Sequence, residues 1–343
     1  MKQILNTLYV QTQGSYLRLD HDTLQVEVER KKTFQMPLHH LGGITVFGNV
    51  LMSPFLIHRC AEDGRALVWL SEHGRFKARL SGSTSGNVLL RKAQHDALNN
   101  PKVTLDIARY IVAGKLQNTR NVLMRAAREA RTEADAQALY DAAKVHADGI
   151  QSAEKAADLD KLRGVEGYGA KAYFNAFSAM VRQNRDAFEL TERTRRPPRD
   201  PINALLSFVY TLLANECIAA CEGVGLDPQV GFLHALRPGR PALALDLMEE
   251  LRAPLADRLV LTLVNRGQIA PDDFVERPGG AISMAEDTRK TLLAAYQKRK
   301  QEEVFHTVAE TKVPLGLIAH TQARLLARHL RGDLPTYQPF ILR

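Results

Sequence analysis

The sequence predicts an α+β protein with a small N-terminal β-sandwich-like domain followed by a larger all-α domain. Three observations predict this class. Residues 1–80 contain short runs of β-branched and aromatic residues separated by turn signals. Residues 88–332 place apolar residues at i, i+3 and i+4 almost throughout. The polar stretch SGSTSGN, at 81–87, separates the two patterns as a linker, and residues 333–343, with two prolines, predict an extended tail.

The first domain is predicted to consist mainly of strands. The runs LNTLYVQT, SYLRLD, LQVEVER and GGITVFG are bounded by turn residues, and LQVEVER alternates apolar and polar residues as a half-buried strand does. One helix is predicted over SPFLIHRCAEDG, where Ser53 can cap it, Pro54 can begin it and Gly64 can end it. RALVWLS and RFKARLSG are predicted to form a closing pair of strands.

The second domain is predicted to consist of helices. The clearest one follows RTRRPPRD, with Asp200 as N-cap, Pro201 at the first position and Gly223 as the stop. A later helix begins in SMAEDTRKTLLAAY, where Ser283 and Glu286 have the spacing of a capping box. The final helix, VPLGLIAHTQARLLARHLRG, ends at a glycine.

The charge and cysteine content narrow the class of function. A net charge of +8 and a pI near 9.4 favour a polyanionic partner, above all nucleic acid. No apolar run approaches the roughly 20 residues of a membrane helix, and the N-terminus lacks a signal peptide's apolar core, so we expect a cytoplasmic protein without a membrane partner. Cys60, Cys217 and Cys221 show no CxxC spacing, which favours buried thiols over zinc or disulfides.

Three stretches carry polar groups that ordinary packing does not require. Glu166 lies between glycines, just before a helix in GVEGYGAKAYFNAF; a carboxylate near a helix N-terminus is the plain alternative. His234 lies among apolar residues, where a structural histidine is the usual interpretation. In DLMEELR, Asp246, Glu249 and Glu250 are predicted to share one helix face, unless they form an ordinary charged surface turn.

Taken together, these residues would form a set of one imidazole and two or three carboxylates. Such a set suits Mg²⁺ or Mn²⁺ better than zinc. The residues alone do not show that Glu166 approaches His234 in space. Signatures of other enzyme classes are missing, because the sequence contains no GxGxxG before a helix, no GxxxxGK[ST] and no GxSxG.

The order of the motifs resembles a known family. A β domain, a helical domain, EGxxAKxYF, RRPPxDPxNALLSFxYxLL and then a histidine followed by LDLMEELR resemble the CRISPR-associated spacer-acquisition integrase, the first of the two universal adaptation proteins. The resemblance implies that Glu166, His234 and Glu249 bind the catalytic divalent metal, Mg²⁺ or Mn²⁺, with Asp246 as a neighbouring acid. The third acid is often Asp in the family, so whether Asp246 or Glu249 makes the closer contact stays open.

The resemblance also implies an activity and partners. The family inserts prespacer DNA into the repeat array by attack of a 3′-hydroxyl on a phosphodiester, and with water as nucleophile the same site would cut DNA. The implied partners are double-stranded DNA, a second copy of the chain joined through the β domain, and the small dimeric second adaptation protein. The tail would dock on that partner or be mobile, and we favour a mobile tail. Two alternatives stay open: a metal-dependent DNA nuclease that does not integrate, and a non-catalytic, basic helical DNA-binding protein.

Basic and polar residues near these motifs are candidates for DNA contacts. Those expected to hold phosphates near the metal are Lys171, Arg237, Arg240 and Arg252. The arginines of RTRRPPRD, which could equally be a solvated linker, are Arg195, Arg196 and Arg199. Asn203, Ser207 and Tyr210 would support the acids or form an ordinary polar helix face. Tyr168 and Tyr173 are expected to pack or to stack on DNA rather than to act as nucleophiles.

Overall fold

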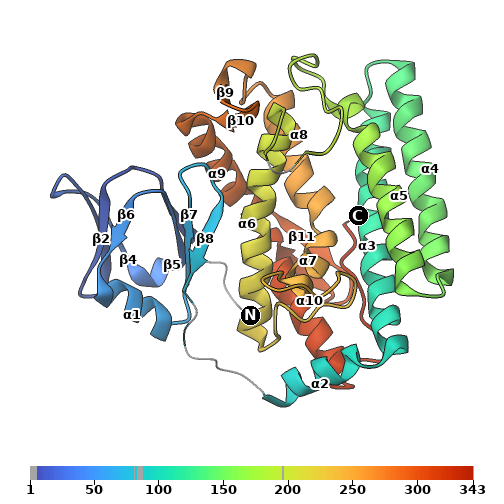
Figure 1. The fold of residues 1–343 in the computed structure, drawn as a ribbon, viewed down its shortest axis with the longest axis horizontal. Helices are drawn as coiled ribbons and strands as arrows, with labels where there is room; N and C mark the ends of the chain where they lie inside the picture. The colour runs from blue at the N-terminus through green and yellow to red at the C-terminus, as the bar shows by residue number, and fades with distance from the viewer. Residues whose placement is uncertain (1–5, 81, 83–87, 195–196, 343) are drawn as a thin grey trace. The chain divides into compact units, whose positions relative to one another are not determined.

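The computed structural model describes residues 6–80, 82, 88–194 and 197–342. The chain divides into two units, Met1–Ser85 and Gly86–Arg343. Apart from residue 82, the predicted linker lies outside the described residues. The first unit is built of strands and one α-helix and the second is mainly helical, which confirms the α+β class (Figure 1).

The N-terminal unit contains two four-stranded sheets, with strand orders β1-β5-β7-β8 and β4-β3-β2-β6. The first is parallel except for its edge strand β8, and the second is an antiparallel meander to which β6 adds in parallel. The strands are β1 (Asn6–Val10), β2 (Ser15–Asp20), β3 (Thr23–Val28), β4 (Lys31–Pro37), β5 (Leu41–Phe47), β6 (Val50–Met52), β7 (Ala66–Leu70) and β8 (Phe76–Arg79).

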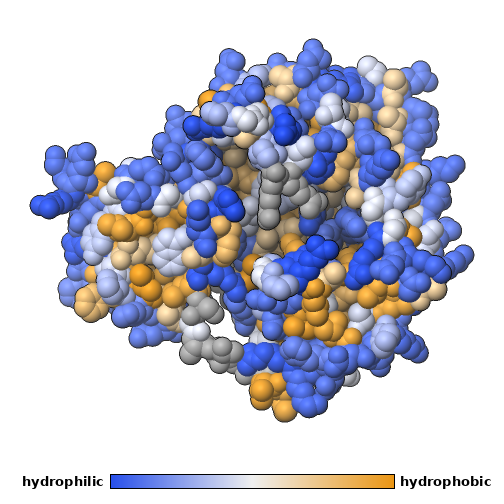
Figure 2. Space-filling model, viewed as in Figure 1, coloured by the Kyte–Doolittle hydropathy of each residue, from blue (hydrophilic) through white to orange (hydrophobic). Residues whose placement is uncertain are grey.

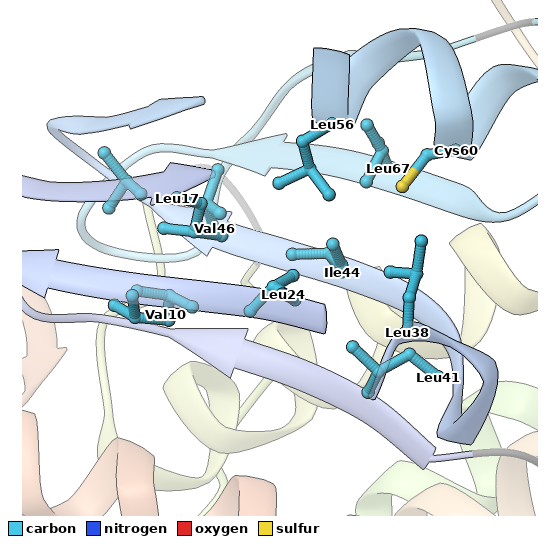
Figure 3. Packing of buried hydrophobic residues seen from close by; sticks show 12 residues of the cluster. Val10, Leu17, Leu24, Leu38, Leu41, Ile44, Val46, Leu56, Cys60 and Leu67 are labelled. Atoms are coloured by element: carbon cyan, nitrogen blue, oxygen red, sulfur yellow. The ribbon is translucent and has the colours of Figure 1, made fainter. Parts of the chain in front are cut away.

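Apolar residues of both sheets form one core in this unit. Leu17 and Leu24 of the second sheet and Ile44 of the first are fully buried within it (Figure 3). The two sheets therefore share their apolar faces, which is the arrangement of a β-sandwich. The predicted alternation in LQVEVER is incomplete, because Leu24, Gln25 and Val26 of β3 are all buried, and β5 is buried along most of its length.

The helix α1 (Pro54–Glu62) covers this core, and its predicted punctuation is confirmed. Ser53 Oγ accepts a hydrogen bond from Leu56 N at 3.2 Å, Pro54 occupies the first position, and Gly64 follows the helix with φ of 65°. Leu56 and Cys60 are both buried and point from the helix toward the strands (Figure 3).

The second unit is built around long helices. α3, α4 and α5 pack side by side, and α6 packs against α7 and α10 (Figure 1). The helices are α2 (Val88–Leu98), α3 (Pro101–Arg128), α4 (Glu133–Lys155), α5 (Leu159–Asn175), α6 (Pro201–Val224), α7 (Ala242–Glu249), α8 (Arg258–Asn265), α9 (Glu286–Gln301) and α10 (Leu315–Leu330).

The helix α6 is the most apolar of the α-helices in the part of the chain that the structure describes. Its N-terminus is capped as predicted, since Asp200 accepts a hydrogen bond from Asn203 N at 2.7 Å. It ends at Val224, with Gly225 at φ of 92° as the C-cap, so the predicted stop at Gly223 is wrong by two residues. The helix is long and apolar enough to cross a membrane, contrary to our expectation, but 67% of the apolar window is buried inside the unit. Cys217 and Cys221 are buried and form no disulfide, as predicted.

Two short hairpins interrupt the helical pattern of this unit. They pair β9 (Phe274–Arg277) with β10 (Ala281–Met284) and β11 (Glu303–His306) with β12 (Thr311–Pro314). Ser283 belongs to β10, and Ala285 is the N-cap of α9, so the predicted capping box is wrong. A polar residue at capping spacing also suits the exposed side of a hairpin strand, and local spacing does not distinguish the two.

The tail after α10 packs against its own unit. Tyr337 and Phe340 are almost completely buried. The Tyr337 hydroxyl donates to Glu250 Oε1 at 2.5 Å, and Phe340 N donates to Glu250 Oε2 at 2.7 Å. Asn118 Nδ2, on α3, donates to the Phe340 carbonyl at 2.8 Å. These contacts hold the tail in place, whereas the interpretation from the sequence favoured a mobile tail.

Candidate active site

A pocket of about 490 Å³ in the helical unit collects the predicted site residues. Its walls come from α3, α5, the loop between α6 and α7, the end of α7 and the π-helical turn Arg252–Asp257. Single-turn π-helices are rare and frequent at functional sites. The charged and polar side chains that line the pocket include Lys115, Glu166, Tyr173, Tyr210, His234, Glu249, Arg252 and Asp257.

Glu166 lies in the middle of α5 and not just before a helix, so that part of the prediction is wrong. The helix begins earlier because Asp158 caps it, accepting a hydrogen bond from Lys161 N at 2.8 Å. Two glycines flanking Glu166 in the same helix made this region resemble a loop in sequence. The helix directs the Glu166 carboxylate into the pocket, where it forms an ion pair with Lys115.

Lys115 is a site residue that the sequence analysis missed. Its ammonium binds Glu166 and also lies 2.7 Å from Glu249 Oε2, so it joins two acids from different helices. Burial alone would lower the pKa of Lys115, but Glu249 and Glu166 outweigh it and the pKa is raised. The sequence did contain one indication of this role, because Lys115 lies between Ile111 and Leu116, which are buried on the inner face of α3.

His234 is held in a defined orientation by Asp246. His234 Nδ1 lies 2.7 Å from Asp246 Oδ1, and Asp246 also accepts hydrogen bonds from the backbone N–H groups of Phe232, Leu233 and His234 at 2.6–3.0 Å. The other ring nitrogen, Nε2, lies 3.7 Å from Glu249 Oε1. With Nδ1 bound to a carboxylate, Nε2 is the nitrogen that faces the pocket.

Glu249 is almost fully buried, with 3% of its side chain exposed, between three cationic or imidazole groups. Arg252 Nη2 lies 3.0 Å from its Oε1, and Lys115 and His234 flank it. Burial would raise the pKa of Glu249, but Arg252, Lys115 and His234 together lower it to about 2. The carboxylate is therefore ionised throughout the neutral range.

Glu250 does not share this face, contrary to the prediction for DLMEELR. The helix α7 ends at Glu249, and the Glu250 carboxyl accepts hydrogen bonds from Gln322 on α10 and from Tyr337 and Phe340 of the tail. Burial raises the pKa of Glu250 to about 8, because these hydrogen bonds only partly offset the loss of water. Glu250 is thus part of the tail's binding site.

A second buried carboxylate lies in the pocket wall. Asp257 accepts hydrogen bonds from the hydroxyls of Tyr210 at 2.6 Å and Tyr173 at 2.9 Å. Burial raises the pKa of Asp257 to about 6. The Arg252 guanidinium lies over the Tyr210 ring, 4.9 Å from its centroid. Tyr173 is therefore a packing residue, as expected, and Tyr168 is 66% exposed and does not line this pocket.

The predicted polar line on α6 divides between two roles. Tyr210 contacts Asp257 in the pocket, whereas Asn203 binds Arg193 and the Asp200 cap, and Ser207 Oγ accepts from Arg193 Nη2 at 3.2 Å. Only the last residue of the line reaches the site.

The basic residues predicted to hold phosphates also divide. Arg237, Arg240 and Arg252 line the pocket. Lys171 is exposed on α5 and does not line it, and Arg199 is exposed before α6. Arg195 and Arg196 lie outside the described residues.

The chemistry of the donor set fits a hard divalent cation. Glu249 Oε2 is buried and, despite its 2.7 Å approach to Lys115 Nζ, has no well-aligned hydrogen bond. One imidazole nitrogen and two carboxylates converge here, and these are ligands that Mg²⁺ and Mn²⁺ accept. Within residues 6–80, 82, 88–194 and 197–342, no three His, Cys, Asp or Glu side chains are spaced to enclose an ion in this arrangement. The Lys115 ammonium lies between Glu166 and Glu249 instead.

Comparison with known proteins places this chain in a family. The family model of the CRISPR associated protein Cas1 matches residues 8–298. The chain is 58% identical over 343 residues to the CRISPR-associated endonuclease Cas1 1 of Moorella thermoacetica, and 47% identical to that of Chlorobaculum tepidum. In both cases the match covers 100% of each chain.

Solved structures share the fold. A CAS1 protein from Thermotoga maritima superposes with a TM-score of 0.82 at 24% identity, covering 98% of this chain and 100% of its own. A casposase bound to its integration product superposes with a TM-score of 0.83 at 20% identity, covering 97% and 93% of the two chains. These likenesses concern the fold, and the family itself rests on the sequence matches. Since the family model matches residues 8–298 and the relatives match the full length, the chain belongs to the Cas1 family of CRISPR-associated proteins.

Proposed function

We propose that this protein is a divalent-metal-dependent DNA endonuclease and integrase of CRISPR adaptation, which inserts prespacer DNA into the repeat array through attack by a 3′-hydroxyl. The observation that carries the proposal is the convergence of Glu166, His234 Nε2 and Glu249 on one pocket that Lys115 and Arg252 also line. The full-length relatives named CRISPR-associated endonuclease support the class of reaction.

In this proposal Glu166, His234 and Glu249 hold Mg²⁺ or Mn²⁺, and Asp246 positions His234 without binding the metal itself. When bound, the metal would polarise the phosphodiester and lower the pKa of the attacking hydroxyl. Arg252, which Glu249 holds at 3.0 Å in the pocket wall, would stabilise the negative charge that develops on the phosphate. Lys115 pairs with both acids in this structure and partly offsets their charge; with a metal bound between the acids, its ammonium would be available to a phosphate oxygen.

The partners are part of the proposal. Arg237 and Arg240, at the rim of the pocket, would bind the backbone of double-stranded DNA on either side of the reacting phosphate. We further propose a homodimer formed through the N-terminal unit, together with the small dimeric second adaptation protein. This unit exposes the large apolar side chains of Tyr16, Phe34, Leu51, Phe55 and Phe76, and hydrophobic patches are visible over it in Figure 2. The cytoplasmic location and the lack of a membrane partner stay predictions.

A strand-transfer assay tests the proposal. A labelled prespacer would be incubated with a plasmid carrying a leader and repeat, the second adaptation protein and Mn²⁺ or Mg²⁺. We expect joined product from the wild type and none from His234→Ala or in the presence of EDTA. The matched control is His95→Ala, an exposed histidine on α2 outside the pocket, which should join DNA normally.

The outcomes separate the alternatives. Cleavage without joining, lost in His234→Ala, would favour the metal-dependent nuclease that does not integrate. Equal cleavage and joining by both proteins would show that the active site lies elsewhere. DNA binding with neither reaction, under every metal condition, would favour the non-catalytic DNA-binding protein.

A further inference from the structure

A second concavity of about 740 Å³ in the helical unit is lined by seven arginines and a single acidic residue. We call it the arginine pocket; it is formed by the C-terminal half of α3, the segment after α5 and the helix α8. It is larger than the candidate active site and shares no lining residue with it. Neither the family match nor the proposed metal site gives these arginines a role.

Three of the seven arginines have a guanidinium group without an acidic or hydrogen-bonding partner among the described residues. The side chains of Arg120, Arg258 and Arg266, unlike their backbones, make no hydrogen bond or ion pair with any residue that the structure describes. Arg258 is half-buried, and burial together with the nearby Arg299 and Arg125 lowers its pKa. Glu302 and Glu129 raise the pKa of Arg258 by less than burial and these cations lower it, so half-burying the guanidinium costs folding free energy that a bound anion would offset.

The other four arginines share few acceptors. Arg125 and Arg182 both bind Glu129, at 3.2 Å and 2.6 Å, so one carboxylate serves two guanidinium groups. Arg128 Nε donates to its own helix at the Met124 carbonyl, and Arg131 Nη1 donates to the Arg182 carbonyl. The pocket therefore keeps a large excess of positive charge.

The lining also indicates which anion fits. Guanidinium groups bind phosphate oxygens through paired N–H donors, and seven of them spread over one concavity suit several phosphates in a row. The lining contains no aromatic side chain on which a base could stack; its apolar members are aliphatic, such as Val122, Met124 and Leu261. Recognition would thus be of the backbone and independent of base sequence.

The arginine pocket lies next to the candidate active site along the chain. Thr119 lines the active-site pocket and Arg120 lines the arginine pocket, both on α3. Likewise, Asp257 lines the active-site pocket and the next residue, Arg258, lines the arginine pocket, at the point where the π-helical turn continues into α8. The helix α3 therefore contributes to both concavities, and the π-helical turn that lines the active-site pocket continues directly into α8, which lines the arginine pocket.

We propose that the arginine pocket holds the phosphodiester backbone of DNA at a site separate from the catalytic centre, next to the DNA segment that reacts. The proposal rests on the proposed function in that it takes DNA as the substrate. It adds a second group of phosphate contacts, made by Arg120, Arg258 and Arg266, to the contacts at the rim of the active site.

The test is DNA binding by the full-length protein, measured by fluorescence anisotropy with labelled duplexes of two unrelated sequences over a range of salt concentrations. The variant is Arg258→Gln/Arg266→Gln. Losing two phosphate contacts should weaken binding roughly tenfold at low salt. It should make the slope of log K against log salt shallower by about 1.8, since each contact contributes about 0.9. Both sequences should be affected equally.

The matched control is Arg324→Gln/Arg328→Gln, which removes the same charge from exposed positions on α10 outside both pockets. It should leave the salt slope unchanged. Arg258→Lys/Arg266→Lys keeps the charges and should restore most of the slope. Thermal melting of each variant verifies that it is folded.

Some outcomes would overturn the proposal. An unchanged slope in the folded Gln variant, or an equal change in the control, would overturn it. Loss of binding to the second adaptation protein with normal DNA binding would assign the pocket to an acidic protein surface instead. The proposed function is tested separately. If the wild type transfers strands and the Gln variant binds DNA normally, only the proposed role of the arginine pocket is refuted. A slope change with no strand transfer would refute only the proposed reaction.

Discussion

Asp246 accepts a hydrogen bond from His234 Nδ1 at 2.7 Å, and the same carboxylate accepts three backbone N–H groups. A carboxylate offers about four acceptor positions, so all of those of Asp246 are used. Asp246 therefore positions His234, and of the two acids Glu249 is the one that we propose as a metal ligand. This is the distinction between Asp246 and Glu249 that sequence spacing left open.

The first prediction concerns this positioning. In Asp246→Asn the amide group would face N–H donors, so the loop and the ring of His234 would lose their fixed orientation. We expect Mn²⁺ affinity, measured by calorimetry, to fall roughly 10–100-fold, as is typical when a partner of a metal-binding histidine is lost. Asp96→Asn removes an exposed carboxylate and should have no effect. An unchanged affinity in Asp246→Asn would assign Asp246 a purely structural role.

The second prediction concerns Lys115. In Lys115→Met the carboxylates of Glu166 and Glu249 would lose the cation between them. Breaking a buried ion pair costs about 3–5 kcal/mol, so the metal-free variant should melt at a lower temperature. Added Mg²⁺ or Mn²⁺ should raise the melting temperature of the variant more than that of the wild type, because the metal restores the missing positive charge.

The control for Lys115 is Lys92→Met. Lys92 pairs with Asp96 at 2.7 Å on the surface of α2, and exposed pairs contribute about 0–1 kcal/mol. Equal stabilisation of the wild type and Lys115→Met by the metal would contradict the proposal that Glu166 and Glu249 share an ion.

The third prediction uses two glycines. A Cβ on Gly231 would lie 2.6 Å from the Ala242 backbone carbon and 2.7 Å from Asp246 Oδ2. Gly231→Ala should therefore displace the loop that carries His234 and reduce strand transfer at least tenfold, although no donor atom is removed. Gly164→Ala is the matched control, because a Cβ there meets nothing within 4 Å and alanine favours the helix α5. Full activity in Gly231→Ala would show that the loop position is not critical.

The fourth prediction concerns pH and Glu250. Its pKa is raised to about 8 from an ordinary value of 4.5, so folding favours the protonated carboxyl. That contribution to stability is complete below about pH 4.5 and is lost as the pH rises toward 8. The free energy of unfolding of the wild type should fall by a few kcal/mol relative to Glu250→Gln across this range. Parallel pH profiles, measured by urea denaturation, would contradict it.

Much of the fold follows from local pattern. The cap at Ser53 and the one at Asp200 each depend on residues within four positions, and both are confirmed. Strands give way to helices near the Gly/Ser stretch because the spacing of apolar residues changes there from about two residues to about 3.6 residues. This spacing can be read directly from a sequence. The hairpin containing Ser283 was missed because polar spacing alone does not distinguish a helix cap from an exposed strand.

The site depends on distances that local pattern does not contain. Glu166 on α5 and Glu249 on α7 meet only through Lys115 on α3, and that meeting requires three helices to pack correctly. The resemblance to a family supplied Glu166, His234 and Glu249 before any geometry. The resemblance could not show that the Glu250 side chain points to the tail. Tyr337 and Phe340, which bind it, lie 87 and 90 residues further along the chain, so no local pattern connects them.

The tail's contacts with Glu250 have a consequence for biosynthesis. Tyr337 and Phe340 follow every described helix in the chain, and they bind the residue next to Glu249. During translation, the end of α7 stays without these contacts until both residues have left the ribosome. A chain released prematurely would leave the Glu250 carboxyl buried without two of its hydrogen-bond donors. Truncated copies would therefore have a destabilised end of α7, directly beside Glu249.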